Sequence, residues 1–181
     1  MKNLSRLLFV FMLSSMVFPA CNATKDLLDV TFRADYEADM DIVVTPDAMK
    51  AGINGVFSES ATIDPLSNDK FAEYADKIKS ITIEEATGTI TWINKNAVLI
   101  TADLNITATD MPSAHWVFTN EPLVQGSVFS LTNEAGQLDK LKDILDAQKV
   151  FTVTFSGQTD EDDLSLTFHT LYGTLVVANP L

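Results

Sequence analysis

Residues 30–44 read VTFRADYEADMDIVV, and this alternation of residue types decides the fold class. Apolar side chains fill every even position, and polar side chains fill the odd positions from 31 to 41. A period of two is typical of a β-strand with one buried face and one face in water. Fifteen extended residues would span about 50 Å, so we expect a bend, a bulge or a short break near Ala38. Pro46 is expected to end the strand.

Several later segments also have strand character. Strands are expected at 81–83 and 89–93, at 98–108, where the even positions are again apolar, around 116–118, and at 128–131, 150–155 and 164–177. Glu121-Pro122 is expected to break the strand around Trp116, and residues 50–60 are predicted to be a loop or a short irregular strand. Asn94-Lys95-Asn96 has the composition of a tight hairpin turn, which predicts that the strand at 98–108 pairs antiparallel with the preceding strand.

Two segments carry helical spacing. Residues 68–78 have apolar side chains at i, i+3, i+4 and i+7 from Phe71 onward, with Ser67 or Asn68 as the N-cap. Residues 133–148 form the second amphipathic segment, which Thr132 or Asn133 can cap. Seven or eight strands with two helical insertions, and no alternating strand–helix rhythm, predict a mainly β fold, an antiparallel β-sandwich or open barrel. We expect residues 29–181 to form this single domain.

The N-terminus has the pattern of a secretion signal. Lys2 and Arg6 precede an apolar stretch at residues 7–18, which Pro19-Ala20-Cys21 follows. This pattern resembles the signal of bacterial lipoproteins, in which the chain is cut before the cysteine and that cysteine carries the lipid. The resemblance implies a signal peptide at residues 1–20 and a tether at 21–28.

The lipoprotein motif is only partly matched. Ala20 and Cys21 fit it, whereas Phe18 and Pro19 depart from it. Ordinary secretion, with cleavage after Ala23 and a soluble secreted or periplasmic product, is therefore the alternative. Asn22 follows the cysteine, and in enteric lipoproteins this residue implies passage to the outer membrane. The expected location is the envelope of a Gram-negative bacterium.

Charge restricts the partners of the chain. The sequence has 12 basic and 25 acidic residues, a net charge of −13. Removing Lys2 and Arg6 with the signal leaves 10 − 25 = −15. Phosphate backbones need the opposite field, so nucleic acid is excluded as a partner, and anionic lipid head groups would be repelled. The expected membrane link is therefore the lipid on Cys21 and not the protein surface.

Two groups of acidic residues are candidate sites. Asp160, Glu161, Asp162 and Asp163 occupy one connection between strands and could supply oxygen ligands to calcium, although a run of charges in a loop is more often simply solvated. The odd positions of the first strand carry Asp35, Glu37, Asp39 and Asp41, which predict an exposed face or a charged edge. No cofactor is expected, with calcium as the one alternative.

Histidines and tryptophans are the remaining candidates. His115 and Trp116 adjoin a proline-flanked loop, where an exposed indole could stack on a sugar or insert into a partner, although core packing is favoured for Trp116. Trp92 shares the even parity of Ile90, which predicts that it is buried. His169 has the opposite parity to Phe168 and is expected to face water. The two histidines lack zinc spacing, and no nucleotide or nucleophile-elbow motif occurs, so we expect no enzyme.

Three functions are compatible with these features. The first is a lipid-anchored binding or structural module of the envelope that recruits a protein or glycan partner through its loops. The second is a carrier that holds a lipid or another apolar ligand inside a barrel. The third is a hydrolase with an unrecognised site. Whether the alanines of the apolar faces, Ala34, Ala38, Ala102 and Ala108, line a void or belong to a packed core separates the first two.

Overall fold

The computed structural model describes residues 28–46 and 54–180, which contain eight strands and two short α-helices. The strands are β1 (Val30–Pro46), β2 (Gly55–Ile63), β3 (Ile78–Ile93), β4 (Ala97–Ala108), β5 (Ala114–Leu123), β6 (Val128–Ser130), β7 (Phe151–Thr159) and β8 (Leu164–Ala178). The helices are α2 (Asp69–Tyr74) and α3 (Gln137–Asp146), and the 3₁₀ turns η2 (Pro65–Ser67) and η3 (Ala75–Lys77) flank α2.

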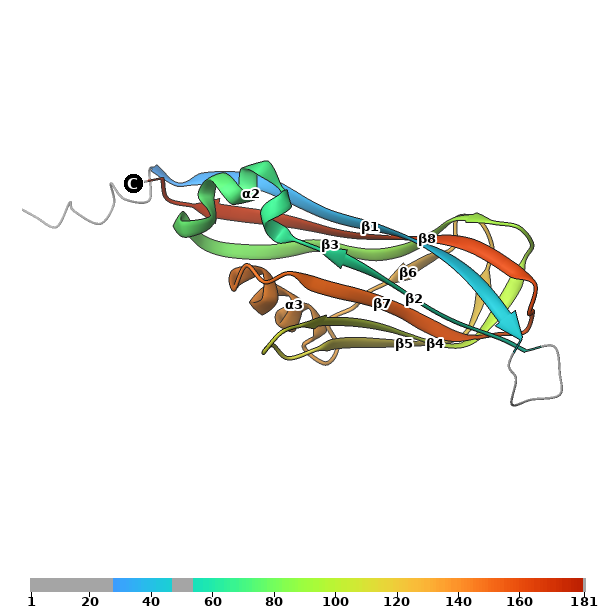
Figure 1. Ribbon diagram of the computed structural model, residues 1–181. Helices are drawn as coiled ribbons and strands as arrows, with labels where there is room; N and C mark the ends of the chain where they lie inside the picture. The colour runs from blue at the N-terminus through green and yellow to red at the C-terminus, as the bar shows by residue number, and fades with distance from the viewer. Residues whose placement is uncertain (1–27, 47–53, 181) are drawn as a thin grey trace, which may run out of the picture.

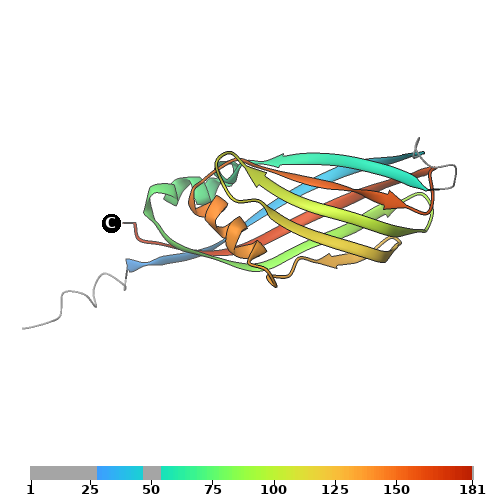
Figure 2. The same cartoon turned by 90° about the horizontal axis from the view of Figure 1, so that it is seen from below.

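The strands form two layers. Their hydrogen-bonded order is β5-β4-β7-β2-β1-β8-β3-β6, and each pairing is antiparallel. β1 and β2 pair only where Thr45 meets Val56 and Pro46 meets Gly55, so the order divides there. We call the two halves the β1 sheet (β1, β8, β3, β6) and the β2 sheet (β2, β7, β4, β5). Figure 1 and Figure 2 show them face to face, which confirms the predicted mainly β fold, an antiparallel β-sandwich or open barrel.

The path of the chain between the layers identifies the type of sandwich. Consecutive strands change layer at every connection except the one from β4 to β5. Strands distant in sequence are therefore neighbours, as when β8 lies between β1 and β3 and β7 lies between β2 and β4. This strand order is that of a jelly roll, an eight-stranded double Greek key.

The two ends of the sandwich differ. Both helices and both ends of the described domain, Val30 and Ala178, lie at one end, which we call the helix end (Figure 1). The connections at 94–96 and 160–163 lie at the opposite end, which we call the turn end (Figure 1). Among the described residues, neither helix is long and apolar enough to cross a membrane.

Aromatic rings from both layers fill the interior. Phe155 of β7 stacks on Phe168 of β8, with ring centroids 4.2 Å apart. Phe129 meets Phe168 edge-on at 5.7 Å, and Phe57 packs on Phe155 at 5.1 Å. Each buried phenylalanine contributes about 1.5–3 kcal/mol through the hydrophobic effect. These contacts join the two sheets through one continuous core.

The alanines of the apolar faces belong to that same core. Ala34 and Ala102 are completely buried, and Ala38 and Ala108 are partly buried against it. Ala102 lies where two strands approach closely, because a Cβ added to Gly157 of β7 would come within 2.7 Å of its side chain. The four alanines therefore accommodate close packing.

β1 follows its predicted pattern but does not break. Its even residues from Phe32 to Val44 are buried, except Ala38, which is partly buried like Val30 at the start of the strand. Its pairing with β8 runs from Val30 opposite Ala178 to Val44 opposite Leu164 with no register shift, so the bulge or short break expected as alternatives near Ala38 is wrong. β8 has 15 residues against the 17 of β1 and follows the same curve, which lets the whole pair bend gradually. Pro46 is the last residue of the strand, as predicted.

The predicted hairpin after Ile93 is wrong. The turn at 94–96 reverses the chain, but β4 pairs with β5 and β7, whereas β3 pairs with β8 and β6. The chain crosses from one layer to the other at this turn. The composition of residues 94–96 therefore predicts that the chain reverses direction. It does not predict which strands pair with β4, because that depends on which strand edges are free.

The buried positions of β4 change from odd to even numbers along the strand. A register shift between Leu99 and Thr101 moves the buried set from Ala97 and Leu99 to the even positions 102, 104 and 106. Val98, predicted to be buried, is therefore exposed. β5 also runs through Pro122 instead of ending before it, because β5 lies at the edge of the sheet, where a missing N–H leaves no partner unpaired.

The helices are shorter than predicted, and the segment 50–60, predicted as a loop or a short irregular strand, is in part a strand. Asn68 caps α2 as expected, since its Oδ1 accepts a hydrogen bond from the Phe71 N–H at 3.1 Å. Ile78, predicted to end this helix, begins β3 instead. Gly136, in the left-handed conformation at φ 73°, precedes α3, and Asn133 Oδ1 accepts from the Leu138 N–H. The second part of the segment 50–60 belongs to β2.

Candidate functional site

The acidic run is part of the structure of the turn end. Asp160 Oδ1 accepts a hydrogen bond from the Val98 N–H at 2.7 Å, and Glu161 pairs with Lys95 at 2.8 Å. The hydrogen bond to Glu161 raises the pKa of Lys95 above its usual value. Within residues 28–46 and 54–180, no three metal-ligating side chains gather closely enough to hold an ion. None of the four carboxylates of the run belongs to such a group of three side chains.

His115 and Trp116 point in different directions. Trp116 is buried, and its Nε1 donates to the Thr132 carbonyl at 2.8 Å, so its indole is not available to a partner. His115 is exposed, with Nε2 2.6 Å from Asp103 Oδ1. The structure therefore does not bring the two residues together as one binding surface. Cys21, the predicted lipid site, lies outside the described residues.

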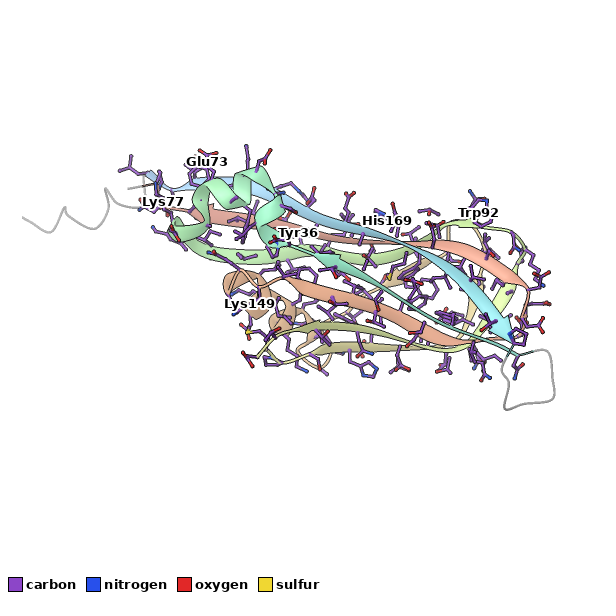
Figure 3. The ribbon with its side chains drawn as sticks, in the orientation of Figure 1. Tyr36, Glu73, Lys77, Trp92, Lys149 and His169 are labelled. Carbon is purple, nitrogen blue, oxygen red and sulfur yellow. The ribbon has the colours of Figure 1, made fainter. Side chains whose placement is uncertain are left out.

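The exposed tryptophan is Trp92, which the parity rule placed in the core. A register shift between Ile90 and Trp92 in β3 puts Thr91 and Trp92 both in solvent, and Trp92 is 50% exposed. Its partner on β8 is Thr167, an outward-facing residue. A β-bulge frequently re-aims a side chain in this way next to a binding site. Figure 3 shows Trp92 and His169 on the same outer side of the β1 sheet.

The acidic residues of β1 complete this surface. Asp35, Glu37, Asp39 and Asp41 are all exposed, which confirms the predicted exposed face. Asp41 Oδ1 accepts a hydrogen bond from the Thr167 hydroxyl at 2.8 Å.

One histidine also belongs to this side of the sheet. Asp39 Oδ1 lies 2.8 Å from His169 Nδ1, and the His169 side chain is 27% exposed, facing water as predicted. Two carboxylates thus hold two β8 side chains in place.

We name the surface formed by Trp92, Thr167, Asp41, His169 and Asp39 the Trp92 face. Neighbouring strands lie about 4.8 Å apart, and alternate residues of one strand about 7 Å apart, so the face extends over roughly the size of one or two sugar rings. Its chemistry is an apolar plate bordered by hydrogen-bond acceptors, an imidazole and a hydroxyl. Such a surface suits a ligand that has both an apolar face and hydroxyl groups.

The Trp92 face was only partly detectable in the sequence. The acidic positions and the outward direction of His169 followed from alternation. Trp92 did not, because a one-residue shift reverses the face of every later side chain. The one signal in the sequence for an exposed Trp92 was its position two residues before Asn94, where the chain reverses and strand pairing ends.

Comparison with known proteins gives no family. No family model matches the chain, and no curated protein matches it. Solved structures with some overlap include turnip yellow mosaic virus, at 13% identity and TM-score 0.39, with 84% of this chain and 95% of the other covered. A second is mud crab tombus-like virus, at 10% identity and TM-score 0.33, with 84% and 83% covered. The jelly-roll assignment above rests on strand order alone.

Proposed function

We propose that this chain is a lipid-anchored binding module of the bacterial envelope, without enzymatic activity, and that it recognises a glycan with the Trp92 face. One observation carries the proposal. A half-exposed tryptophan lies on an open sheet surface beside fixed carboxylates and a hydroxyl. The C–H face of a sugar can stack on the indole while its hydroxyl groups donate to Asp41 and Asp39.

The geometry of the sandwich supports this use of the face. If Cys21 carries a lipid, the helix end faces the membrane, because the described domain begins there. β1 alone would extend about 50 Å from that end. Trp92, next to the last residue of β3, lies toward the turn end (Figure 3) and therefore far from the bilayer. A ligand outside the membrane could reach it.

The acidic surface narrows the class of glycan. The four exposed acidic side chains of β1, together with the overall negative charge, repel anionic polysaccharides. Neutral or amino-substituted sugars are therefore the expected ligands. A phosphate- or sulfate-bearing glycan would be bound weakly.

The alternative functions have less support in the structure. The aromatic core occupies the space between the layers, and the four alanines pack within it, which gives no support to an internal lipid cavity. Both histidines contact an aspartate, yet among the described residues neither ring is hydrogen-bonded to a serine hydroxyl. The hydrolase alternative therefore lacks a nucleophile beside its base.

The test is affinity electrophoresis of the purified protein through gels that contain neutral polysaccharides, followed by fluorescence titration with the oligosaccharide that retards it. Stacking on the half-exposed Trp92 should shift its emission to the blue, whereas buried Trp116 should contribute no shift. Trp92→Ala should abolish retardation, and Asp41→Asn should weaken it.

Val117→Ala is the matched control, since it truncates an exposed apolar side chain on the opposite sheet. Retardation that survives Trp92→Ala, or that falls equally in Val117→Ala, would contradict the proposed face. If no neutral polysaccharide retards the protein, the proposal that its partner is a glycan is wrong. A protein partner would then be the remaining alternative.

A further inference from the structure

A second surface, on the opposite side of the sandwich from the Trp92 face, is the outer side of the β2 sheet. Figure 2 looks onto this side and shows its strands uncovered by either helix. Strand register aligns the outward side chains in rows, one of which runs Ser60, Thr154, Asn105 and His115 across the four strands. We call this surface the β2 face. Its outward residues are Val56, Ser58, Ser60 and Thr62 of β2, Thr152, Thr154, Ser156 and Gln158 of β7, Thr101, Asp103, Asn105 and Thr107 of β4, and His115, Val117 and Thr119 of β5.

The β2 face carries almost no charge, although the chain is strongly acidic. The chain has 25 acidic residues and a net charge of −13, yet Asp103 is the one acidic residue among those named for this face. Asp103 Oδ1 lies 2.6 Å from His115 Nε2. The outer side of the β1 sheet, by contrast, exposes the four carboxylates of β1. Of the two outer sheet surfaces, the β2 face is therefore the one that repels a second acidic molecule less.

The polar groups of the β2 face are mostly hydroxyls, which suit a surface of the same kind. A hydroxyl both donates and accepts, as Ser60 Oγ and Thr154 Oγ1 show at 2.8 Å across β2 and β7. The threonines add methyl groups, and Val117 adds an apolar side chain that is 56% exposed. Non-obligate interfaces are no more apolar than ordinary protein surface, so this mixture of methyl and hydroxyl groups suits one.

The β2 face is also regular and large enough for an interface. β2 and β7 pair along the whole length of β2 without a register shift, and the shift between β7 and β4 lies near the turn end. Four strands about 4.8 Å apart and the nine residues of β7 at about 3.3 Å each give about 550 Å² per copy. Two such faces together would bury about 1,100 Å², slightly more than the roughly 1,000 Å² that a specific interface needs.

We propose that two copies of this chain associate through their β2 faces, with one sheet packed on the other around a two-fold axis. A self-complementary patch used by both copies is the usual arrangement of a homodimer, and aligned sheets pack face to face at about 30°. With the two-fold axis parallel to the strands, both helix ends lie on the same side of the dimer. Two lipid anchors could then enter one membrane, where confinement to a surface raises the effective concentration. That orientation, unlike the association itself, rests on the proposed lipid anchor.

Sedimentation velocity of the purified full-length protein in a non-ionic detergent, over a wide range of protein concentrations, tests the association. We expect a monomer–dimer equilibrium that sodium chloride strengthens, because salt screens the repulsion between two acidic copies. Thr154 lies midway along an inner strand of the sheet, so a charge there meets the same charge of the other copy. Thr154→Lys and Thr154→Glu should each raise the dimer Kd at least about ten-fold. An equimolar mixture of the two variants should associate again, since opposite charges then meet.

Val43→Lys is the matched control, since it places a charge at a 67% exposed position on the outer side of the β1 sheet. It should not raise the dimer Kd. An equal rise in this control, or no gain on mixing the two Thr154 variants, would overturn the proposal. So would a protein that stays monomeric at every concentration, which would leave an uncharged partner of another kind as the occupant. Trp92→Ala should leave the dimer Kd unchanged, so the association and the glycan surface can fail independently.

Discussion

The two tryptophans show how one residue type takes opposite roles at the scale of single side chains. Trp116 is 4% exposed and satisfies its N–H through the Thr132 carbonyl, as a buried indole requires. Trp92 is 50% exposed and lies against a bulged strand. Burial and exposure were each decided by register and not by the chemistry of indole.

Truncation of a core aromatic residue should lower the free energy of unfolding much more than truncation of the exposed Trp92. Phe155→Ala should lower the free energy of unfolding by about 3–5 kcal/mol, because it removes the ring stacked on Phe168 and leaves a cavity between the sheets. Trp92→Ala should change it by about 0.5 kcal/mol or less. Urea unfolding followed by circular dichroism measures both. Similar losses in the two variants would show that Trp92 is structural.

The tyrosines predict a loss of stability at alkaline pH. Burial raises the pKa of Tyr36 and Tyr172 above the usual 10.0. Between the unfolded and folded pKa, the unfolded chain loses protons that the native state keeps, so stability is full below pH 10 and falls as the pH rises further. Tyrosinate absorbance at 295 nm should therefore reach the three-tyrosine value only as circular dichroism reports unfolding. Full ionisation with native dichroism would contradict this.

At the scale of elements, register shifts do most to determine which surface each strand presents. The shift in β4 exposes Val98 and buries Ala102, and the shifts in β3 bring Trp92 to the outside. β1, without a shift, keeps its acidic residues on one face along its full length. The Trp92 face therefore needs both kinds of strand: the uninterrupted β1 supplies the carboxylates, and the bulged β3 supplies the indole.

Close approach of β7 to β4 beside the β4 shift makes Gly157 hard to replace. A Cβ there would meet the Thr101 carbonyl and the side chain of Ala102, both parts of β4. Gly157→Ala should therefore cost about 1–3 kcal/mol through overpacking. Ser156→Ala, one residue earlier on the same strand, is the control. Equal urea midpoints for the two variants would show that the strands separate without cost.

At the scale of the whole molecule, the jelly-roll path sets the two ends apart. Every connection between layers runs over one end or the other, and the helices occupy the end where the described domain begins and ends (Figure 2). A lipid on Cys21 would then leave the turn end pointing away from the bilayer. The net charge of −15 after signal removal would keep the acidic domain off anionic head groups.

Replacement of the anchoring residue tests that orientation directly. Cys21→Ala should move the protein from the membrane fraction to the soluble fraction while the dichroism spectrum of the folded domain stays unchanged. Trp92→Ala should remain with the membrane, as the matched control on the domain surface. If Cys21→Ala still sediments with membranes after a high-salt wash, the attachment lies elsewhere in the chain.

The sequence by itself determined the class of fold, the inward and outward faces of β1, a cap at Ser67 or Asn68, and the acidic character of the surface. These properties depend on neighbours within a few residues, where backbone geometry and side-chain chemistry act directly. Alternation along residues 30–44 needs no knowledge of the partner strand. The lipoprotein signal and its cysteine remain sequence-based predictions of the same local kind.

Only the tertiary structure decided which strands pair, where the register shifts, and which of the two tryptophans is exposed. Thr167 and Asp41 are 126 residues apart, and no local pattern specifies that they meet. The neighbour of each strand depends on which edges remain free once two layers close over one core. A bulge compensates for differences in curvature between such strands, so the outward direction of Trp92 is decided only when the sandwich forms.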